Sequence, residues 1–215
     1  MIQASGVTKR FRGLDVLQGA DLEAVPGRVT LLTGANGSGK STLLKILAGL
    51  LPPDGGTASI GGMDVVQRRI SSQRLLAFLP QNVTFHPAST PEGILEFYGR
   101  LRGTDKGRRN RLLAEFDLES AATRPICKLS GGMLQRLGLV LALLPDAPAL
   151  ILDEPGASLD PEWRIVLREE LLNEARRGKT ILLTSHLPEE WSDATDTWFD
   201  CREGRIFSSE PREAA

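Results

Sequence analysis

Residues 34–42 read GANGSGKST and fit the pattern G-x-x-x-x-G-K-S/T of a phosphate-binding loop. The apolar run VTLLT at 29–33 precedes it and predicts a buried strand, while the apolar spacing of KSTLLKILAGL at 40–50 predicts a helix after it. Glycines let successive backbone N–H groups point inward, and a helix N-terminus adds a positive dipole. The sequence therefore predicts a strand–loop–helix unit that binds phosphate groups. A Gly-rich turn before a helix is the structural alternative.

Two side chains of this loop have the chemistry that a nucleotide phosphate and its metal ion need. We expect Lys40 to reach the β- and γ-phosphates and the Ser41 hydroxyl to ligate Mg²⁺. The predicted nucleotide-binding residues of the loop are Gly34, Ala35, Asn36, Gly37, Ser38, Gly39, Lys40, Ser41 and Thr42.

Two adjacent carboxylates follow a second apolar run. Residues 149–152 (ALIL) predict a buried strand, and Asp153 and Glu154 come directly after it. Ligands of open α/β sheets bind at the carboxyl ends of the strands, where this pair falls. We expect Asp153 to hold Mg²⁺ and Glu154 to polarise an attacking water. The alternative is an acidic pair that caps the next turn.

A second anion-binding helix start follows the middle of the chain. Residues 129–133 read LSGGM (Leu129, Ser130, Gly131, Gly132 and Met133) and open the apolar segment LQRLGLVLALL. Ser130 is a predicted N-cap, and the glycines expose backbone N–H groups. A single domain rarely needs two such sites for one triphosphate.

The order of the predicted elements indicates an α/β fold with a mostly parallel sheet and helices on both faces. We expect one domain over residues 1–215: a core from 1–81 and 146–207, a helical subdomain at 82–145, and a frayed tail at 208–215. Further predictions are strands at 57–60, 75–79 and 180–184, helices at 161–177 and around 189–196, and a hairpin around Glu203-Gly204.

Composition and the lengths of apolar stretches argue against several classes of protein. The 215 residues hold 26 Lys and Arg against 27 Asp and Glu, and this balance argues against a protein built mainly to bind nucleic acid. The longest strongly apolar stretch, residues 137–144, is far shorter than the roughly 20 residues of a membrane span. The first residues, MIQASGVTKRFRG, show no signal-peptide core, and two distant cysteines form no metal cluster. We expect a cytoplasmic chain with reduced thiols.

Over roughly residues 2–207 the chain resembles the ATP-binding cassette (ABC) ATPases, the nucleotide-binding subunits of ABC transporters. Its LSGGM stands where that family has the signature LSGGQ, so only Met133 departs. The resemblance assigns Phe11 to the aromatic position that stacks on adenine, Gln81 to the Q-loop that senses Mg²⁺, and His186 to the switch at the γ-phosphate. It assigns Ser158, Leu159 and Asp160 to the D-loop that crosses to a second subunit. Phe11 as a core residue and Asp160 as a helix N-cap before Pro161 are the structural alternatives.

The resemblance implies a P-loop NTPase-type fold with an N-terminal antiparallel β subdomain and an inserted helical subdomain. It also implies ATP as substrate with Mg²⁺, and a head-to-tail homodimer that holds each ATP between one phosphate loop and the other signature. A membrane permease is the implied second partner, which would hold the chain on the inner face of the cell membrane. We expect the permease to dock in a groove lined by Val83, Phe85, Phe97 and Tyr98.

The segments LPQNVTFHP, LEFYGRLRG and GGMLQRLGL are similar to those of ATPases of ABC-2-type exporters, including the one linked to nitrous-oxide reductase maturation. A soluble ABC ATPase of an assembly pathway, for example for iron–sulfur clusters, is the alternative function. A non-enzymatic nucleotide-binding module is disfavoured because Glu154 and His186 are both present. The basic run KGRRNR at 106–111 is interpreted as a solvated helix face.

Overall fold

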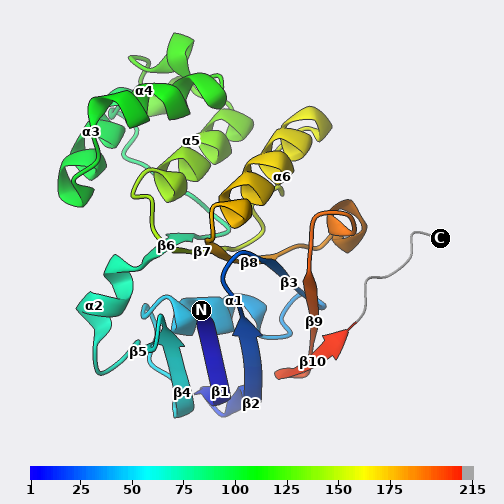
Figure 1. Ribbon diagram of the computed structural model, residues 1–215. Helices are drawn as coiled ribbons and strands as arrows, with labels where there is room; N and C mark the ends of the chain where they lie inside the picture. The colour runs from blue at the N-terminus through cyan, green and yellow to red at the C-terminus, as the bar shows by residue number, and fades with distance from the viewer. Residues whose placement is uncertain (210–215) are drawn as a thin grey trace.

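The computed structural model describes residues 1–209, which form two sheets and a set of helices (Figure 1). The smaller sheet is antiparallel, in the order β2-β1-β4-β5. Its strands are β1 (Ile2–Phe11), β2 (Leu14–Ala24), β4 (Gly55–Ile60) and β5 (Met63–Asp64). This sheet is the expected N-terminal antiparallel subdomain, and β4 and β5 form a hairpin around Gly61-Gly62.

The larger sheet has the order β10-β9-β3-β8-β7-β6. Its strands are β3 (Val29–Thr33), β6 (Leu76–Leu79), β7 (Ala149–Leu152), β8 (Thr180–Thr184), β9 (Thr197–Arg202) and β10 (Arg205–Ser209). Every neighbouring pair is parallel except β9 and β10, which form an antiparallel hairpin. The α/β fold with a mostly parallel sheet is confirmed, and the carboxyl ends of β3, β7 and β8 lie at one edge.

Successive side chains along the strands of the large sheet pack into two separate apolar cores. Leu31 belongs to the core shared with the helices α5 (Gly131–Leu143) and α6 (Pro161–Arg176), whereas its neighbour Leu32 belongs to the core shared with α1 (Lys40–Leu47) and the small sheet. Figure 1 shows α1 between the two sheets and α5 with α6 on the opposite face. Burial of each such leucine side chain stabilises the fold by about 1.5–3 kcal/mol. The helices α1, α5 and α6 cover both faces of the large sheet, as predicted.

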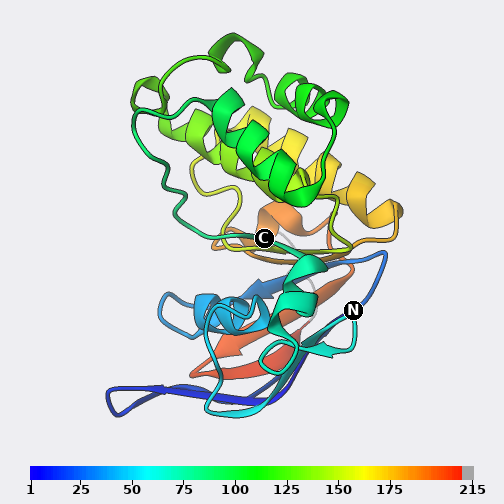
Figure 2. The same cartoon turned by 90° about the vertical axis from the view of Figure 1, so that its left-hand side faces the viewer.

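The middle of the chain is a helical block at one end of the molecule (Figure 2). It contains α3 (Pro91–Arg102), α4 (Lys106–Glu115) and α5, with single 3-10 turns at Glu119–Ala121 and Ile126–Lys128. The Thr90 hydroxyl accepts the Gly93 N–H at 3.2 Å and the Asp105 carboxylate accepts the Arg108 N–H at 2.9 Å, so both helices begin at capping side chains. The short helix α2 (Arg69–Arg74) was not predicted.

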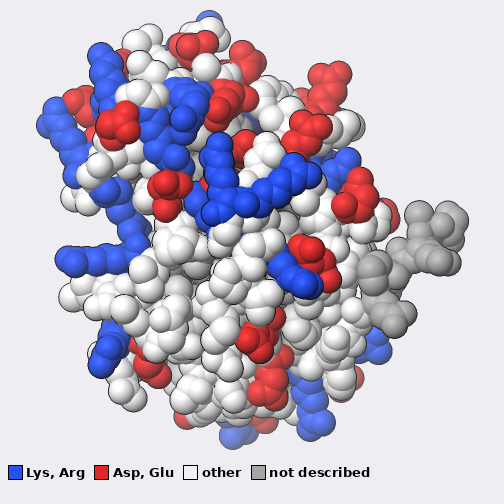
Figure 3. Space-filling model, in the orientation of Figure 1, with Lys and Arg blue, Asp and Glu red and all other residues white. Residues whose placement is uncertain are grey.

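Charged side chains of both signs are intermixed over the helical end in Figure 3. The run 106–111 is only partly a solvated face. Arg111 lies 3.6 Å from Glu115 on the surface, but Arg108 is largely buried and donates to the carbonyls of Leu143 and Leu144 at the end of α5. Arg108 thus ties α4 to α5, which the charge pattern alone did not predict.

Two predicted boundaries need correction. The segment around 189–196 forms one 3-10 turn, Pro188–Trp191, because side chains there bond to backbone groups: Thr195 Oγ1 donates to the Trp191 carbonyl, and the Asp196 carboxylate accepts the Val29 N–H. Ser208 and Ser209 belong to β10, so the expected frayed tail does not begin at 208; its remainder, 210–215, lies outside the described residues. Within residues 1–209, no helix has the length and apolar character of a membrane span.

Candidate functional site

The loop at 34–39 is held in a shape that only glycine permits at two positions. Gly34 has φ 137° and Gly39 has φ 112°, both in the left-handed region. A Cβ at Gly34 would lie 2.3 Å from the Cys201 carbonyl oxygen, and one at Gly39 would lie 2.8 Å from the Val16 carbonyl oxygen. The loop is therefore packed backbone to backbone against β9 and β2.

The Lys40 ammonium lies inside this loop. Lys40 is buried, and its Nζ donates to the carbonyls of Gly34 at 2.7 Å and Ala35 at 3.0 Å. Lys40 also begins α1, whose N-cap Gly39 offers no side-chain cap, so the first N–H groups of the helix are not satisfied by a capping side chain. The combination of an ammonium and a helix N-terminus is a site for an anionic, phosphate-like group.

Both acidic residues after β7 are buried, and a threonine from β8 bonds to the carboxylate of the first and to the backbone of the second. Thr184 Oγ1 donates to Asp153 Oδ1 at 2.8 Å and accepts the Glu154 N–H at 2.9 Å. Sequence reasoning missed Thr184. Its signal is a hydroxyl at the last position of the strand TILLT, two residues before the predicted His186.

Glu154 and His186 form a direct pair. Glu154 has φ 52°, a left-handed conformation that is uncommon for a residue with a side chain. Its Oε2 accepts the His186 backbone N–H at 3.0 Å and lies 2.7 Å from the ring Nδ1. An ionised carboxylate only accepts, so Nδ1 carries the proton and Nε2 is left as an acceptor in the neutral ring. This carboxylate is held in one orientation and is able to take a proton from a water.

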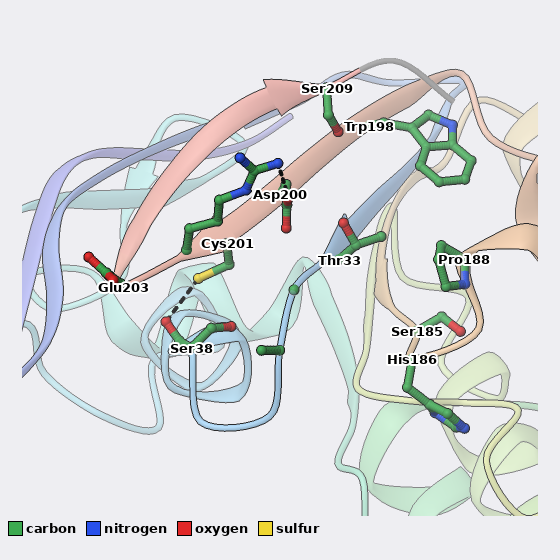
Figure 4. A pocket seen from close by; sticks show the side chains of 13 residues that line it. Thr33, Ser38, Ser185, His186, Pro188, Trp198, Asp200, Cys201, Glu203 and Ser209 are labelled. Carbon is green, nitrogen blue, oxygen red and sulfur yellow. Dashed lines mark hydrogen bonds and ion pairs between the residues drawn. The ribbon is translucent and has the colours of Figure 1, made fainter. Parts of the chain in front are cut away.

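A cavity of about 530 Å³ brings the phosphate-binding loop and His186 together. Its walls come from the loop, from the segment after β8 and from β9, with Gly34, Ala35, Ser38, Ser185 and His186 among the lining residues. Figure 4 shows Ser38 and Cys201 on one side of the cavity and Ser185 with His186 on the other. Residues of the loop and His186 thus line one space, whereas Lys40 and Glu154 do not line it; their roles toward a nucleotide stay predictions.

Cys201 closes the floor of this cavity behind the loop. Its Sγ donates to the Ser38 carbonyl at 3.0 Å, and burial raises the pKa of the thiol. The thiol is therefore protonated at neutral pH and supports the loop instead of acting as a nucleophile. Nothing in the sequence pattern pointed to this contact, which joins residues far apart in the chain.

The two predicted oxygen ligands, Asp153 and Ser41, are of the kind that binds Mg²⁺ together with phosphates. Within residues 1–209, no group of three His, Cys, Asp or Glu side chains forms a metal site by itself. Mg²⁺ in nucleotide enzymes is typically held by one or two protein oxygens plus substrate phosphates. Asp153 and Ser41 provide a carboxylate and a hydroxyl of that kind, so this donor set fits the expected ion.

The signature segment lies beside the D-loop of the same chain. Ser130 Oγ accepts the Met133 N–H at 3.2 Å and begins α5 as the predicted N-cap. A Cβ at Gly132 would lie 3.5 Å from the Ser158 carbonyl oxygen. Asp160 accepts the Trp163 N–H at 3.0 Å, so the expected alternative, an N-cap before Pro161, is also present. Among the hydrogen bonds of the described chain, none joins the signature to the phosphate-binding loop.

Phe11 and Gln81 lie outside the cavity walls. Phe11 ends β1 with 42% of its surface exposed, which excludes the core alternative, and the Lys9 ammonium lies 5.5 Å from its ring centroid. Gln81 is exposed and follows β6, the strand beside β7. Their roles toward a nucleotide stay predictions.

A second hollow of about 400 Å³ lies between β6, α3 and α5. Val83, Phe85 and Tyr98 line it as expected, and Gly138 of α5 lets Val83 approach, since a Cβ there would lie 2.8 Å from Val83 Cγ2. Phe97 does not line it. Its ring meets Tyr98 edge-on at 5.3 Å and 60% of the residue is exposed, because the helix turns it away from the hollow.

Comparison with known proteins finds relatives that are named as ATP-binding proteins. Residues 17–157 match the family described as ABC transporter. The Nod factor export ATP-binding protein I of Burkholderia lata is 38% identical over 95% of this chain and 68% of its own length, and that of Azorhizobium caulinodans is 33% identical over 91% and 62%. The daunorubicin resistance ATP-binding protein of Streptomyces coeruleorubidus is 32% identical over 96% and 67%. The chain spans about two thirds of the length of these relatives.

Solved structures share the fold. An ATP-binding subunit of an ABC transporter superposes with a TM-score of 0.91 and 27% identity, over 98% of this chain and 90% of the other. A dimeric bacterial ABC transporter cassette superposes with a TM-score of 0.89 over the full length of both chains. Its identity is 24%, so it adds evidence for the fold alone.

Proposed function

The chain belongs to the ABC transporter family as an ATP-hydrolysing subunit, and we propose that it dimerises on ATP to drive a separate membrane permease of an exporter. The observation that carries this proposal is the shared cavity. It is lined by the phosphate-binding loop and by His186, and His186 is paired at 2.7 Å with the buried Glu154.

In the proposed reaction each group has one task. Lys40 binds the β- and γ-phosphates, while Asp153 and Ser41 would hold Mg²⁺, which would neutralise charge on the phosphates. Glu154 takes the proton of the attacking water as general base. His186 keeps the Glu154 carboxylate oriented through its backbone N–H and ring, while Thr184 holds the Asp153 carboxylate and the backbone N–H of Glu154.

The proposed assembly is a head-to-tail homodimer. The signature begins α5 beside Ser158, and its hydrogen bonds run to its own helix and not to the loop that holds ATP. A second copy would bring its signature, with the free N–H groups of a helix N-terminus, over the nucleotide. Each site would then be complete only in the dimer.

We also propose that a permease docks in the hollow lined by Val83, Phe85 and Tyr98. This hollow has apolar aromatic walls and an exposed rim that includes Tyr98 and Leu101 on α3. Exposed apolar patches of this kind mark protein interaction sites. Two relatives are named for Nod factor export and one for daunorubicin resistance, which supports export.

Steady-state ATP hydrolysis by the purified chain tests the enzymatic part. We expect turnover with Mg²⁺ and loss of turnover when EDTA removes the ion, because the donor set includes only one carboxylate and relies on phosphates. ATP hydrolysis that is insensitive to EDTA would contradict the assigned metal site.

The variant Phe11→Ala tests the adenine contact. Loss of this contact should weaken ATP binding by about 1–3 kcal/mol.

Tyr98→Glu should prevent permease binding and leave basal ATP hydrolysis unchanged. A carboxylate on the apolar wall would have to be desolvated when a partner docks. The measurement is co-purification from detergent-solubilised membranes with a multi-span membrane protein encoded beside this chain. Phe97→Glu is the matched control, since it alters an exposed aromatic on the same helix outside the hollow. Equal loss in both variants, or loss of basal turnover in Tyr98→Glu, would contradict this docking site.

A further inference from the structure

A buried amide on α5 bonds directly to the segment that follows Glu154. Gln135 is 5% exposed, and its Nε2 donates to the Pro155 carbonyl at 2.9 Å. Gln135 belongs to the second turn of the helix that the signature serine begins. The first five residues of α5 and this one hydrogen bond thus connect Ser130 to Pro155, the residue after Glu154.

This amide is costly to bury and is placed among apolar side chains. The other buried residues of α5 are Leu137, Gly138, Leu139, Val140, Ala142 and Leu143. A buried amide without a partner costs about 1–3 kcal/mol, so its hydrogen bond selects one position of the Pro155 peptide. The buried hydrogen bond between the Gln135 amide and the Pro155 carbonyl therefore points to a positioning role.

The Pro155 peptide matters because Glu154 is strained. Glu154 has φ 52°, and such conformations persist only when the surroundings fix them from several sides. Thr184 Oγ1 accepts the backbone N–H of Glu154, and the His186 backbone N–H donates to the Glu154 carboxylate. Gln135 holds the carbonyl of the next residue and so supplies the third restraint.

A parallel contact joins the next residue of α5 to the helix after the D-loop. The Arg136 guanidinium lies 4.2 Å from the Trp163 ring centroid and donates to the Phe116 carbonyl at 2.9 Å. The N–H of Trp163 is capped by Asp160 of the D-loop. The second turn of the signature helix is therefore tied to the segment 154–163 at two points, Pro155 and Trp163.

We propose that Gln135 is a positioning residue that couples the two ATP sites of the dimer. This inference rests on the proposed sandwich dimer, in which Ser130 contacts the ATP of the second subunit. When the signature engages that ATP, α5 is fixed, and Gln135 then holds the Pro155 peptide and the orientation of Glu154 at its own ATP. Binding at one site thereby prepares the carboxylate of the other.

The test is ATP hydrolysis by full-length Gln135→Met, which keeps the length of the side chain but removes the amide. We expect kcat to fall about tenfold with little change in KM, since one hydrogen bond corresponds to about one decade in rate. We also expect the Hill coefficient for ATP to fall toward 1 from a wild-type value of up to about 2 for two sites. Gln73→Met is the matched control, because Gln73 Nε2 also donates to backbone carbonyls, of Ala48 and Gly49, away from both sites.

The possible outcomes distinguish coupling between the two ATP sites from other roles of Gln135. Wild-type kcat and cooperativity in Gln135→Met would overturn the proposal, as would a lower kcat with unchanged cooperativity. Gln135→Asn, which keeps the amide but shortens it by one methylene, should behave like Gln135→Met; loss of folding in both variants would make Gln135 a structural residue and also overturn the proposal. A wild-type chain that hydrolyses ATP without dimerising would instead refute the dimer on which the inference rests.

Discussion

Lys40→Ala is expected to weaken ATP binding strongly and, with it, hydrolysis. The Lys40 ammonium is the buried cation inside the phosphate-binding loop, held at 2.7 Å and 3.0 Å from two loop carbonyls. Without it, the carbonyls of Gly34 and Ala35 lose their donor and the β- and γ-phosphates lose their counter-charge. Truncation of one member of a buried charged contact costs about 2–5 kcal/mol, or roughly 30- to 4,000-fold in affinity.

Isothermal titration of each variant with Mg²⁺–ATP measures this effect. Lys45→Ala is the control, because Lys45 is exposed in the last turn of the same helix and faces away from the loop. Wild-type affinity in Lys40→Ala would show that the loop at 34–42 does not bind the nucleotide phosphates. Equal losses in both lysine variants would point to destabilised folding of α1 instead.

The parts of the fold that the sequence predicted correctly are those with local causes. Glycines at 34 and 39, an apolar strand before them and an amphipathic helix after them are enough to specify the loop, because each requirement acts within a few residues. The same holds for Ser130 and Asp160, whose caps reach only three residues ahead. Local chemistry therefore predicted the shape of the loop and the starts of two helices.

The parts that sequence reasoning missed depend on contacts between distant elements. Thr184 reaches Asp153 from the neighbouring strand, Cys201 supports the loop from β9, and Gln135 meets Pro155 from another helix. Strand order and helix packing decide these pairs, and neither follows from spacing along the chain. Phe97 was misplaced for a related reason, since a one-residue difference rotates a side chain by about 100° around a helix.

Glu154→Gln is expected to bind ATP normally and to turn it over roughly 10²- to 10⁴-fold more slowly, the usual worth of a positioned base. Glutamine keeps the size of the side chain, but an amide does not take the proton from the attacking water. A phosphate-release assay at saturating Mg²⁺–ATP measures this loss. Glu169→Gln is the control, an exposed acid on α6 outside the site, and it should retain wild-type turnover.

Near-normal turnover in Glu154→Gln would show that this carboxylate is not the base. His186 would then be the next candidate to position the water, since its Nε2 is left as an acceptor by the bond of Nδ1 to Glu154. The proposed role of the buried Asp153 toward the metal would not change, because it does not depend on which group takes the proton. This outcome would revise the chemistry without affecting the assignment of the loop.

The oligomeric state of Glu154→Gln with and without Mg²⁺–ATP tests the central claim most directly, by size-exclusion chromatography with light scattering. Without nucleotide we expect monomers, because two facing carboxylate-rich sites repel each other until Mg²⁺–ATP bridges them. With Mg²⁺–ATP the unhydrolysed complex should elute as a stable dimer of twice the mass. An unchanged elution volume and mass on addition of Mg²⁺–ATP would contradict the ATP-sandwich dimer.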